Sequence, residues 1–215
     1  AELTEYLTEL TRHAPKEYMR PHFFVNTPDI NPVLLQTGGR AAFQTRAILA
    51  GTLSSLWGMY SGFELCEGTP VPGKEEYLDS EKYEIKAWDW DRPGNIRAYV
   101  ARLNRIRRDN PALHELANLQ FLTAWNDHVL FYGKMTARRD NILWIAVNLD
   151  PHNVQEATIE LPFWELGLDE GAAVDADELL TGEPVRWLGR YQKISLDPKL
   201  NPCAIWRVRM PAEKS

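Results

Sequence analysis

The residue of this sequence best placed to do chemistry is Asp29, in the string Asn26-Thr27-Pro28-Asp29 that directly follows a short apolar run. A carboxylate at the end of a strand can accept hydrogen bonds from ligand hydroxyls or balance a developing positive charge. Asp is also common in turns and helix caps, and taken alone this position would more often be such a residue. Both interpretations stay open at this point.

A second candidate segment, residues 75–84, packs charged side chains beside Tyr77 and Tyr83. Lys and Tyr tips can donate to and accept from sugar hydroxyls, and an aromatic ring can lie against the apolar face of a sugar. Composition alone favours a solvated charged loop. Trp88 and Trp90 follow, either as a stacking platform or, more commonly, as anchors that hold a loop onto the fold.

The sequence gives no indication of a metal-binding or phosphate-binding site. No nucleophile elbow, glycine-rich phosphate loop or zinc motif is present. The five histidines show no metal-ligand spacing, and we interpret each as a surface or capping residue: His13, His22, His114, His128 and His152. We therefore predict no metal and no cofactor.

Composition narrows the class of protein and of partner. The 215 residues are 44% hydrophobic and 25% charged, with 8 Trp, which excludes a disordered, collagenous or simple coiled-coil chain. A net charge of −6 without a basic cluster argues against a nucleic-acid or anionic-membrane partner and suits a neutral ligand. No apolar run is long enough to span a bilayer. Cys66 and Cys203 lack CxxC spacing, so we predict no disulfide framework and a reducing compartment.

The first half of the chain alternates helices with short apolar runs. Helical spacing over residues 3–10 predicts an opening helix, and residues 42–53 and 96–106 predict two more. The run 22–26 is typical of a buried parallel strand, and 56–60 is a second short apolar run that we interpret as a parallel strand. A loop of about thirty residues, 62–92, separates the second run from the last helix, and a loop of this length is more often functional than accidental.

The second half changes to a period of two, which predicts an antiparallel β domain. Strands are expected at 119–125, 129–135, 142–148, 154–161 and 204–210. In the last of these, Trp206, Val208 and Met210 alternate with Arg207 and Arg209, the signature of a strand buried on one face. A small β-sandwich or Greek-key domain follows from this pattern.

Two parallel strands with three helices are too few for a sheet that is buried on both faces. The interpretation is the C-terminal part of a (β/α)8 barrel, with its last two strands and their helices, followed by a C-terminal antiparallel β-sandwich domain. We expect residues 1–113 to form the barrel portion and 114–215 the sandwich, and the chain to be part of a longer protein. Barrel active sites lie at the carboxyl ends of the strands, where Asp29 and the loop 62–92 fall.

Several strings are specific enough to identify a family. They are residues 23–30, Gly38-Gly39-Arg40, 56–65 and 76–83, with Leu179-Leu180-Thr181-Gly182 and 187–191 in the second half. Together they closely resemble the α-1,4-glucan:maltose-1-phosphate maltosyltransferases of glycoside hydrolase family 13, the α-amylase superfamily. The resemblance extends over nearly the whole chain.

This resemblance implies a retaining transfer of maltosyl from maltose 1-phosphate to the non-reducing end of an α-1,4-glucan. The nucleophile and the general acid, whose carboxyls must lie about 5 Å apart for retention, match no position here, so the isolated chain is expected to be inactive. Asp29 matches the third catalytic carboxylate, which stabilises the transition state. Lys82 and Tyr83 match a loop expected to close around the maltosyl unit, with Asn26, Ser80 and Glu81 as nearby support.

The implied partners are maltose 1-phosphate and α-1,4-glucan, with no nucleic acid and no membrane, in a cytoplasmic homodimer. Two other interpretations remain open. One is a trehalose synthase or an amylase-type glycoside hydrolase, although the usual Asn-His-Asp motif is replaced here by Asn26-Thr27-Pro28-Asp29. The other is a noncatalytic glucan-binding or interface module, which would use exposed rings among five tryptophans of the second half: Trp125, Trp144, Trp164, Trp187 and Trp206.

Overall fold

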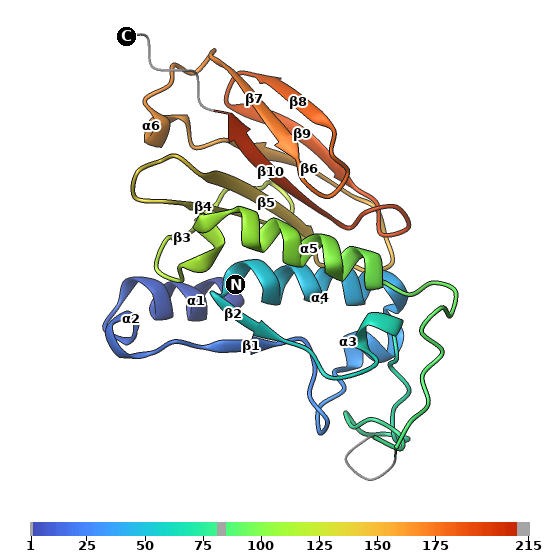
Figure 1. Cartoon of the computed structure of the whole chain (residues 1–215). Helices are drawn as coiled ribbons and strands as arrows, with labels where there is room; N and C mark the ends of the chain where they lie inside the picture. The colour runs from blue at the N-terminus through green and yellow to red at the C-terminus, as the bar shows by residue number, and fades with distance from the viewer. Residues whose placement is uncertain (1, 81–84, 210–215) are drawn as a thin grey trace.

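The computed structural model describes residues 2–80 and 85–209. Figure 1 shows two layers: helices with a small sheet, and a larger antiparallel β region packed on them. The first part of the chain contains α1 (Glu2–Arg12), α2 (Pro15–Tyr18), β1 (His22–Phe24), α3 (Val33–Thr37), α4 (Gly39–Leu53), β2 (Leu56–Gly58), the 3-10 turn η1 (Phe63–Leu65), α5 (Arg97–Asp109) and η2 (Pro111–His114). The three predicted helices and both parallel strands are confirmed.

Strands β1 and β2 pair in parallel, with His22 opposite Leu56 and Phe24 opposite Gly58. The prediction that the first strand is buried is wrong for His22 and Phe24, which are exposed. The reason is that α4 covers one face of this two-stranded sheet, while these two rings project from the other. They lie over Gly58, where an added Cβ would come within 2.7 Å of Phe24 and 2.9 Å of His22.

The second part of the chain forms a six-stranded sheet in the order β3-β4-β5-β10-β7-β8, opposed by a two-stranded sheet, β6-β9. The predicted strands appear as β3 (Leu119–Leu122), β4 (Val129–Met135), β5 (Ile142–Asn148), β6 (Gln155–Glu160) and β10 (Cys203–Arg209). In β10, Trp206 and Val208 are buried and Arg207 and Arg209 exposed, as predicted, and Met210 lies outside the described residues.

Three strands and a short helix lie between the last two predicted strands, where the sequence predicted none: β7 (Ala173–Glu178), β8 (Pro184–Leu188), β9 (Tyr191–Leu196) and α6 (Phe163–Leu166). Individual positions break the alternation of these strands, because Glu178 of β7 is a buried charged residue, while Leu188 of β8 and Tyr191 of β9 are exposed.

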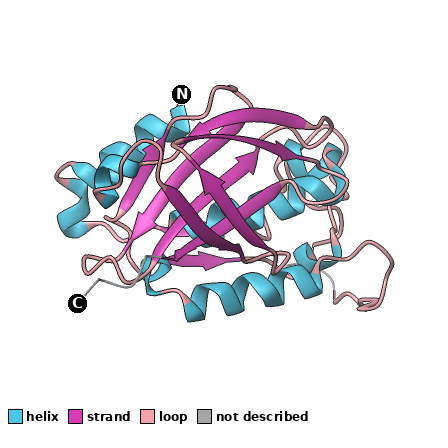
Figure 2. Cartoon of the chain, turned by 90° about the horizontal axis from the view of Figure 1, so that it is seen from above, coloured by secondary structure: helices cyan, strands magenta, loops and turns pink. Residues whose placement is uncertain are grey.

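The central strand β5 is buried on both faces, and this joins the layers. Leu143, Ile145 and Val147 belong to a core cluster that also contains residues of α4 and α5. Trp144 and Ala146, on the other face, pack in a second cluster with residues of β6. Figure 2 shows helices behind the strands and beside them. The predicted boundary between residues 113 and 114 stays a prediction, since one core extends across it.

Candidate functional site

The carboxyl ends of β1 and β2 are joined by the amide of Asn26, a predicted site residue that is only 2% exposed. Its Nδ2 donates to the hydroxyl of Tyr77, 2.6 Å away, and its Oδ1 accepts from the backbone N–H of Tyr60 at 2.8 Å. One side chain thus fixes the segment after β1, the segment after β2 and the long loop relative to one another. The hydrogen-bonding capacity of an amide, which both donates and accepts, permits this double role.

Tyr77 lies in the second candidate segment, but the sequence did not predict its contact with Asn26. Its ring lies 5.7 Å from that of Tyr60, and burial raises the pKa of Tyr77 to about 12, so the phenol stays neutral at physiological pH. From α4, Arg46 donates to the carbonyl of Val25 at 2.8 Å. No local signal links Asn26 to a tyrosine 51 positions away, and only the fold brings them together.

Asp29 lies at the tip of a tight turn at the carboxyl end of β1. Thr27 and Ile30 exchange backbone hydrogen bonds of 3.1 and 3.2 Å, and the N–H of Asp29 donates to Thr27 Oγ1 at 3.3 Å. The side chain is exposed. Asp29 is therefore a turn residue by its backbone, and its carboxylate is accessible at the barrel face where the site was predicted.

The long loop is more ordered than its sequence suggested. Residues 69–78 fold back on themselves: the N–H of Val71 donates to Glu76 and that of Leu78 to Thr69, at 2.9 and 3.0 Å. This turn is tied to the segment after β1, because the N–H of Asn31 donates to the carbonyl of Glu75 at 2.8 Å. At its end Ser80 is buried. The predicted Glu81, Lys82 and Tyr83 lie outside the described residues.

Trp88 anchors the returning part of this loop. The backbone of Gly62 has φ +92°, a conformation that favours glycine, and an added Cβ would lie 2.6 Å from the Trp88 ring. The Lys86 ammonium lies 5.3 Å from the centre of the same ring. Trp90 is partly exposed beside the Arg97 guanidinium, at 5.9 Å. Of the two interpretations, an anchor that holds the loop onto the fold describes Trp88 better than a stacking platform does.

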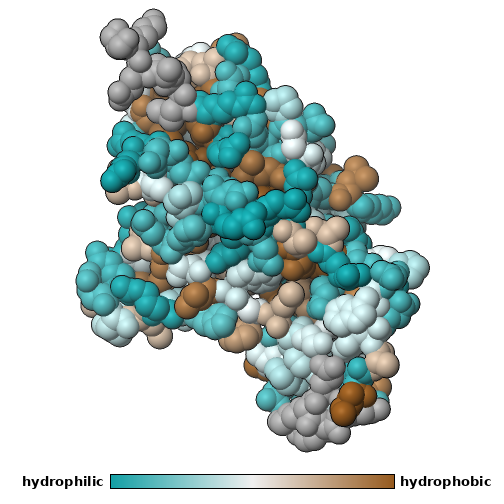
Figure 3. Space-filling model, in the orientation of Figure 1, coloured by the Kyte–Doolittle hydropathy of each residue, from teal (hydrophilic) through white to brown (hydrophobic). Residues whose placement is uncertain are grey.

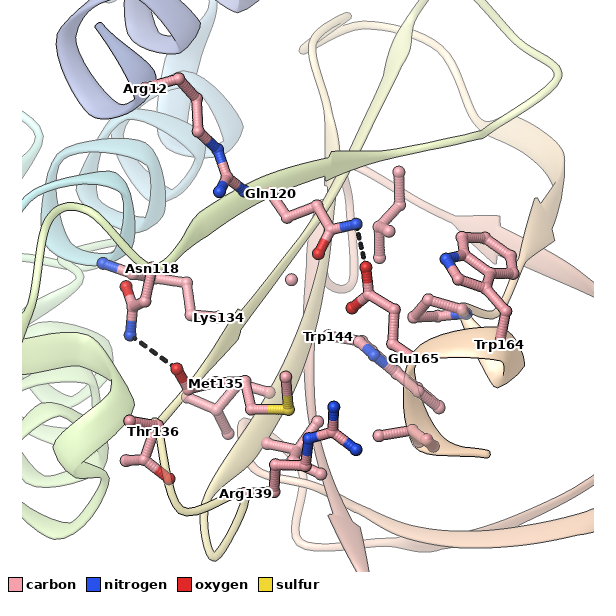
Figure 4. A pocket seen from close by; sticks show the side chains of 17 residues that line it. Arg12, Asn118, Gln120, Lys134, Met135, Thr136, Arg139, Trp144, Trp164 and Glu165 are labelled. Atoms are coloured by element: carbon pink, nitrogen blue, oxygen red, sulfur yellow. Dashed lines mark hydrogen bonds between the residues drawn. The ribbon is translucent and has the colours of Figure 1, made fainter. Parts of the chain in front are cut away.

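A cavity of about 630 Å³ lies elsewhere, between α1, the β3–β5 sheet and α6. Figure 4 shows Arg12, Lys134, Arg139 and Glu165 around it, with Gln120 hydrogen-bonded to Glu165. None of Asn26, Asp29 and Ser80 lines it. Over residues 2–80 and 85–209, no group of three or more His, Cys, Asp or Glu side chains is arranged to hold a metal ion, and no helix is long and apolar enough to cross a membrane.

Comparison with known proteins identifies relatives over nearly the full chain. The family model described as "GLGE, C-terminal" matches residues 121–208. An α-1,4-glucan:maltose-1-phosphate maltosyltransferase of Cereibacter sphaeroides is 51% identical over 98% of this chain and 32% of its own length. One of Pseudomonas aeruginosa is 53% identical over 97% of this chain and 31% of its own length. About half of the residues of this chain are therefore identical to those of each of these maltosyltransferases. The chain spans about a third of the length of these relatives.

Solved structures share the fold of this chain. An α-amylase of Geobacillus thermoleovorans superposes with a TM-score of 0.65 at 15% identity, over 98% of this chain and 43% of its own. A maltogenic α-amylase of Thermotoga neapolitana gives 0.66 at 13% identity, over 98% and 46%. The chain thus has the predicted architecture, the C-terminal part of a (β/α)8 barrel followed by an antiparallel β-sandwich.

Proposed function

We propose that this chain is the part of a retaining maltosyltransferase that supplies the transition-state-stabilising carboxylate, Asp29, and a donor-binding loop. In the full-length protein, maltosyl would move from α-maltose 1-phosphate to the non-reducing end of an α-1,4-glucan. The observation that carries this proposal is the identity of about half of all residues, over nearly the whole chain, with relatives that bear this name.

The placement of Asp29 supports its role. Its carboxylate is exposed at the carboxyl end of β1, and a fixed negative charge there would stabilise the cation-like sugar of a glycosyl transfer. Asn26 acts as a positioning residue, because it ties the segment that carries Asp29 to Tyr77 on the loop that leads to Ser80. Lys82, Tyr83 and Glu81 complete the proposed donor-binding loop.

The chain alone would be inactive, since the nucleophile and the general acid match none of its positions. Exposed apolar side chains on α1, β1 and β2 support a role inside a larger assembly, with Leu3 at 40%, Phe24 at 49% and Leu56 at 53% exposure. We propose that the remaining barrel covers them and that the whole protein is a cytoplasmic homodimer, a location consistent with the free thiols of Cys66 and Cys203. Sedimentation of the full-length protein as a monomer would contradict the dimer.

The full-length protein, incubated with maltose 1-phosphate and a short α-1,4-glucan, should release phosphate and extend the glucan by two glucose units at a time. The isolated chain should do neither. Starch hydrolysis or conversion of free maltose to trehalose, without phosphate dependence, would replace this proposal by an amylase-type hydrolase or a trehalose synthase. Transfer by the isolated chain would contradict the assignment of the missing carboxylates.

A further inference from the structure

The β-sandwich carries an exposed aromatic pair that the candidate site does not use. Trp125 is 55% exposed and Tyr191 51% exposed, and their ring centres lie 5.6 Å apart with an angle of 54° between the planes. We propose that this aromatic face, formed by Trp125, Tyr191 and the outer side of the β6-β9 sheet, binds an α-glucan chain. The choice of an α-glucan as the ligand rests on the proposed function.

The backbone holds both rings in place. The N–H of Trp125 donates to the carbonyl of Thr158 at 2.9 Å, which fixes the β3–β4 connection along strand β6. Tyr191 begins β9, opposite Glu160. The Arg190 guanidinium lies 4.8 Å from the centre of the Tyr191 ring and donates to its hydroxyl, while Glu160 holds Arg190 in an ion pair of 3.1 Å. A fixed ring loses little entropy on binding, so the pair is preorganised.

Polar groups line a shallow groove of about 380 Å³ that the Trp125 ring borders. On the outer side of the sheet, Glu156 pairs with Ser195 and Thr158 with Lys193. Within the described part of the chain, no hydrogen bond or ion pair occupies these four side chains. They present hydroxyl, carboxylate and ammonium groups, which together can donate to and accept from sugar hydroxyls.

The charge of the aromatic face favours a neutral ligand. Arg190 forms ion pairs with both Glu160 and Glu170, and Glu156 and Lys193 are of opposite sign, so these residues carry no surplus of positive charge. A nucleic acid would require a surplus of positive charge. A pyranose presents apolar C–H faces for stacking and hydroxyls at its rim, which matches two rings bordered by uncharged and balanced polar groups.

A second exposed tryptophan provides the control. Trp164 on α6 is 56% exposed, nearly the same as Trp125, but it borders the large cavity among Arg12, Arg139 and Glu165 (Figure 4). No aromatic ring contact involves Trp164 within residues 2–80 and 85–209. Loss of either ring removes a comparable exposed surface, so only a specific site makes the two variants differ.

The test is electrophoresis of the full-length protein through gels that contain glycogen, compared with gels without it. The retardation gives a dissociation constant for glycogen. Trp125→Ala should raise this dissociation constant about tenfold, the factor expected for one lost stacking contact. Lys193→Ala, which leaves both rings in place, should raise it by a smaller factor. Trp164→Ala should migrate as the parent protein does and retain its transfer activity. The Michaelis constant for glycogen should rise with Trp125→Ala by the same factor as the dissociation constant.

Equal retardation of the parent, Trp125→Ala and Lys193→Ala proteins would overturn the glucan site, whatever their transfer activity. A change in sedimentation with unchanged retardation would also overturn it and would assign this face to a protein contact. If the parent releases no phosphate from maltose 1-phosphate but its retardation still depends on Trp125, the proposed function fails and the glucan site stands.

Discussion

The strands that carry the candidate site and the strand at the centre of the β region are built in opposite ways. β1 and β2 have three residues each, and His22, Phe24 and Leu56 among them are exposed. β5 has seven residues, all buried. The site is held by individual hydrogen bonds that cross between loops, such as those of Asn26, whereas the sheet is held by packing on both faces. Substitutions in the β region should therefore lower mainly stability, and substitutions at the candidate site should lower mainly activity.

The largest effect is expected in the β region. Trp144 is 1% exposed, with its ring 6.0 Å from that of Trp187, so Trp144→Ala would leave a cavity in the centre of the sandwich. The free energy of unfolding should fall by about 3–5 kcal/mol, measured by urea denaturation. Trp164→Ala, at an exposed position, should change it by less than about 0.5 kcal/mol. Similar losses for both variants would mean that packing on β5 is not what stabilises this region.

The next largest effect should appear in activity alone. Asp29→Asn in the full-length protein removes the charge that we assign to the transition state, so the rate of maltosyl transfer should fall about 100- to 1000-fold. The Tm should stay nearly unchanged, because the side chain is exposed. The matched control is Asp169→Asn, an exposed aspartate of the β region, which should affect neither quantity. A near-normal rate for Asp29→Asn would reduce Asp29 to a turn residue.

A smaller effect should touch activity and stability together. Tyr77→Phe deletes the hydroxyl that accepts from Asn26 Nδ2 and leaves that buried N–H without its acceptor, at a cost of about 1–3 kcal/mol. We expect the loop to shift, kcat/KM to fall about tenfold and the Tm to drop slightly. Tyr18→Phe, at a side chain that is 76% exposed, is the control and should match the parent protein. Parent-like kinetics for Tyr77→Phe would show that Asn26 does not need this contact to position the site.

The contrast between packing in the β region and individual hydrogen bonds at the site also explains which features the sequence could predict. The helices and the strands β4, β5 and β10 follow from apolar periodicity, because burial of their side chains imposes it. Strands β7, β8 and β9 were missed because their alternation is broken at individual positions, such as the buried Glu178 and the exposed Leu188. The turn around Asp29 was predictable from its residue types, but the pairing of Asn26 with Tyr77 was not, since it depends on two loops that meet only in three dimensions. Family resemblance, rather than periodicity, identified the candidate site.

Taken per unit of pH, the smallest change in stability concerns Lys134, the buried lysine of β4. Burial lowers the pKa of Lys134 to about 7, although its ammonium donates to the carbonyl of Glu115. The unfolded chain, in which the pKa is near its ordinary value of 10.5, therefore binds more protons between about pH 7 and 10.5. Stability should rise with pH across this window, by at most about 1.4 kcal/mol per pH unit, and the cost of burying the charge should be complete below pH 7.

Replacement of this amine by a thioether tests whether stability rises with pH because of Lys134. Lys134→Met should flatten the rise of Tm between pH 7 and 9, and its advantage over the parent protein should be greatest at the acidic end. Lys199→Met, at an exposed position, should keep the slope of the parent. Parallel Tm curves for the parent and Lys134→Met would show that the amine keeps its proton when folded. The carbonyl of Glu115 would then stabilise a buried charge, and the β region, like the candidate site, would depend on an individual polar contact and not on packing alone.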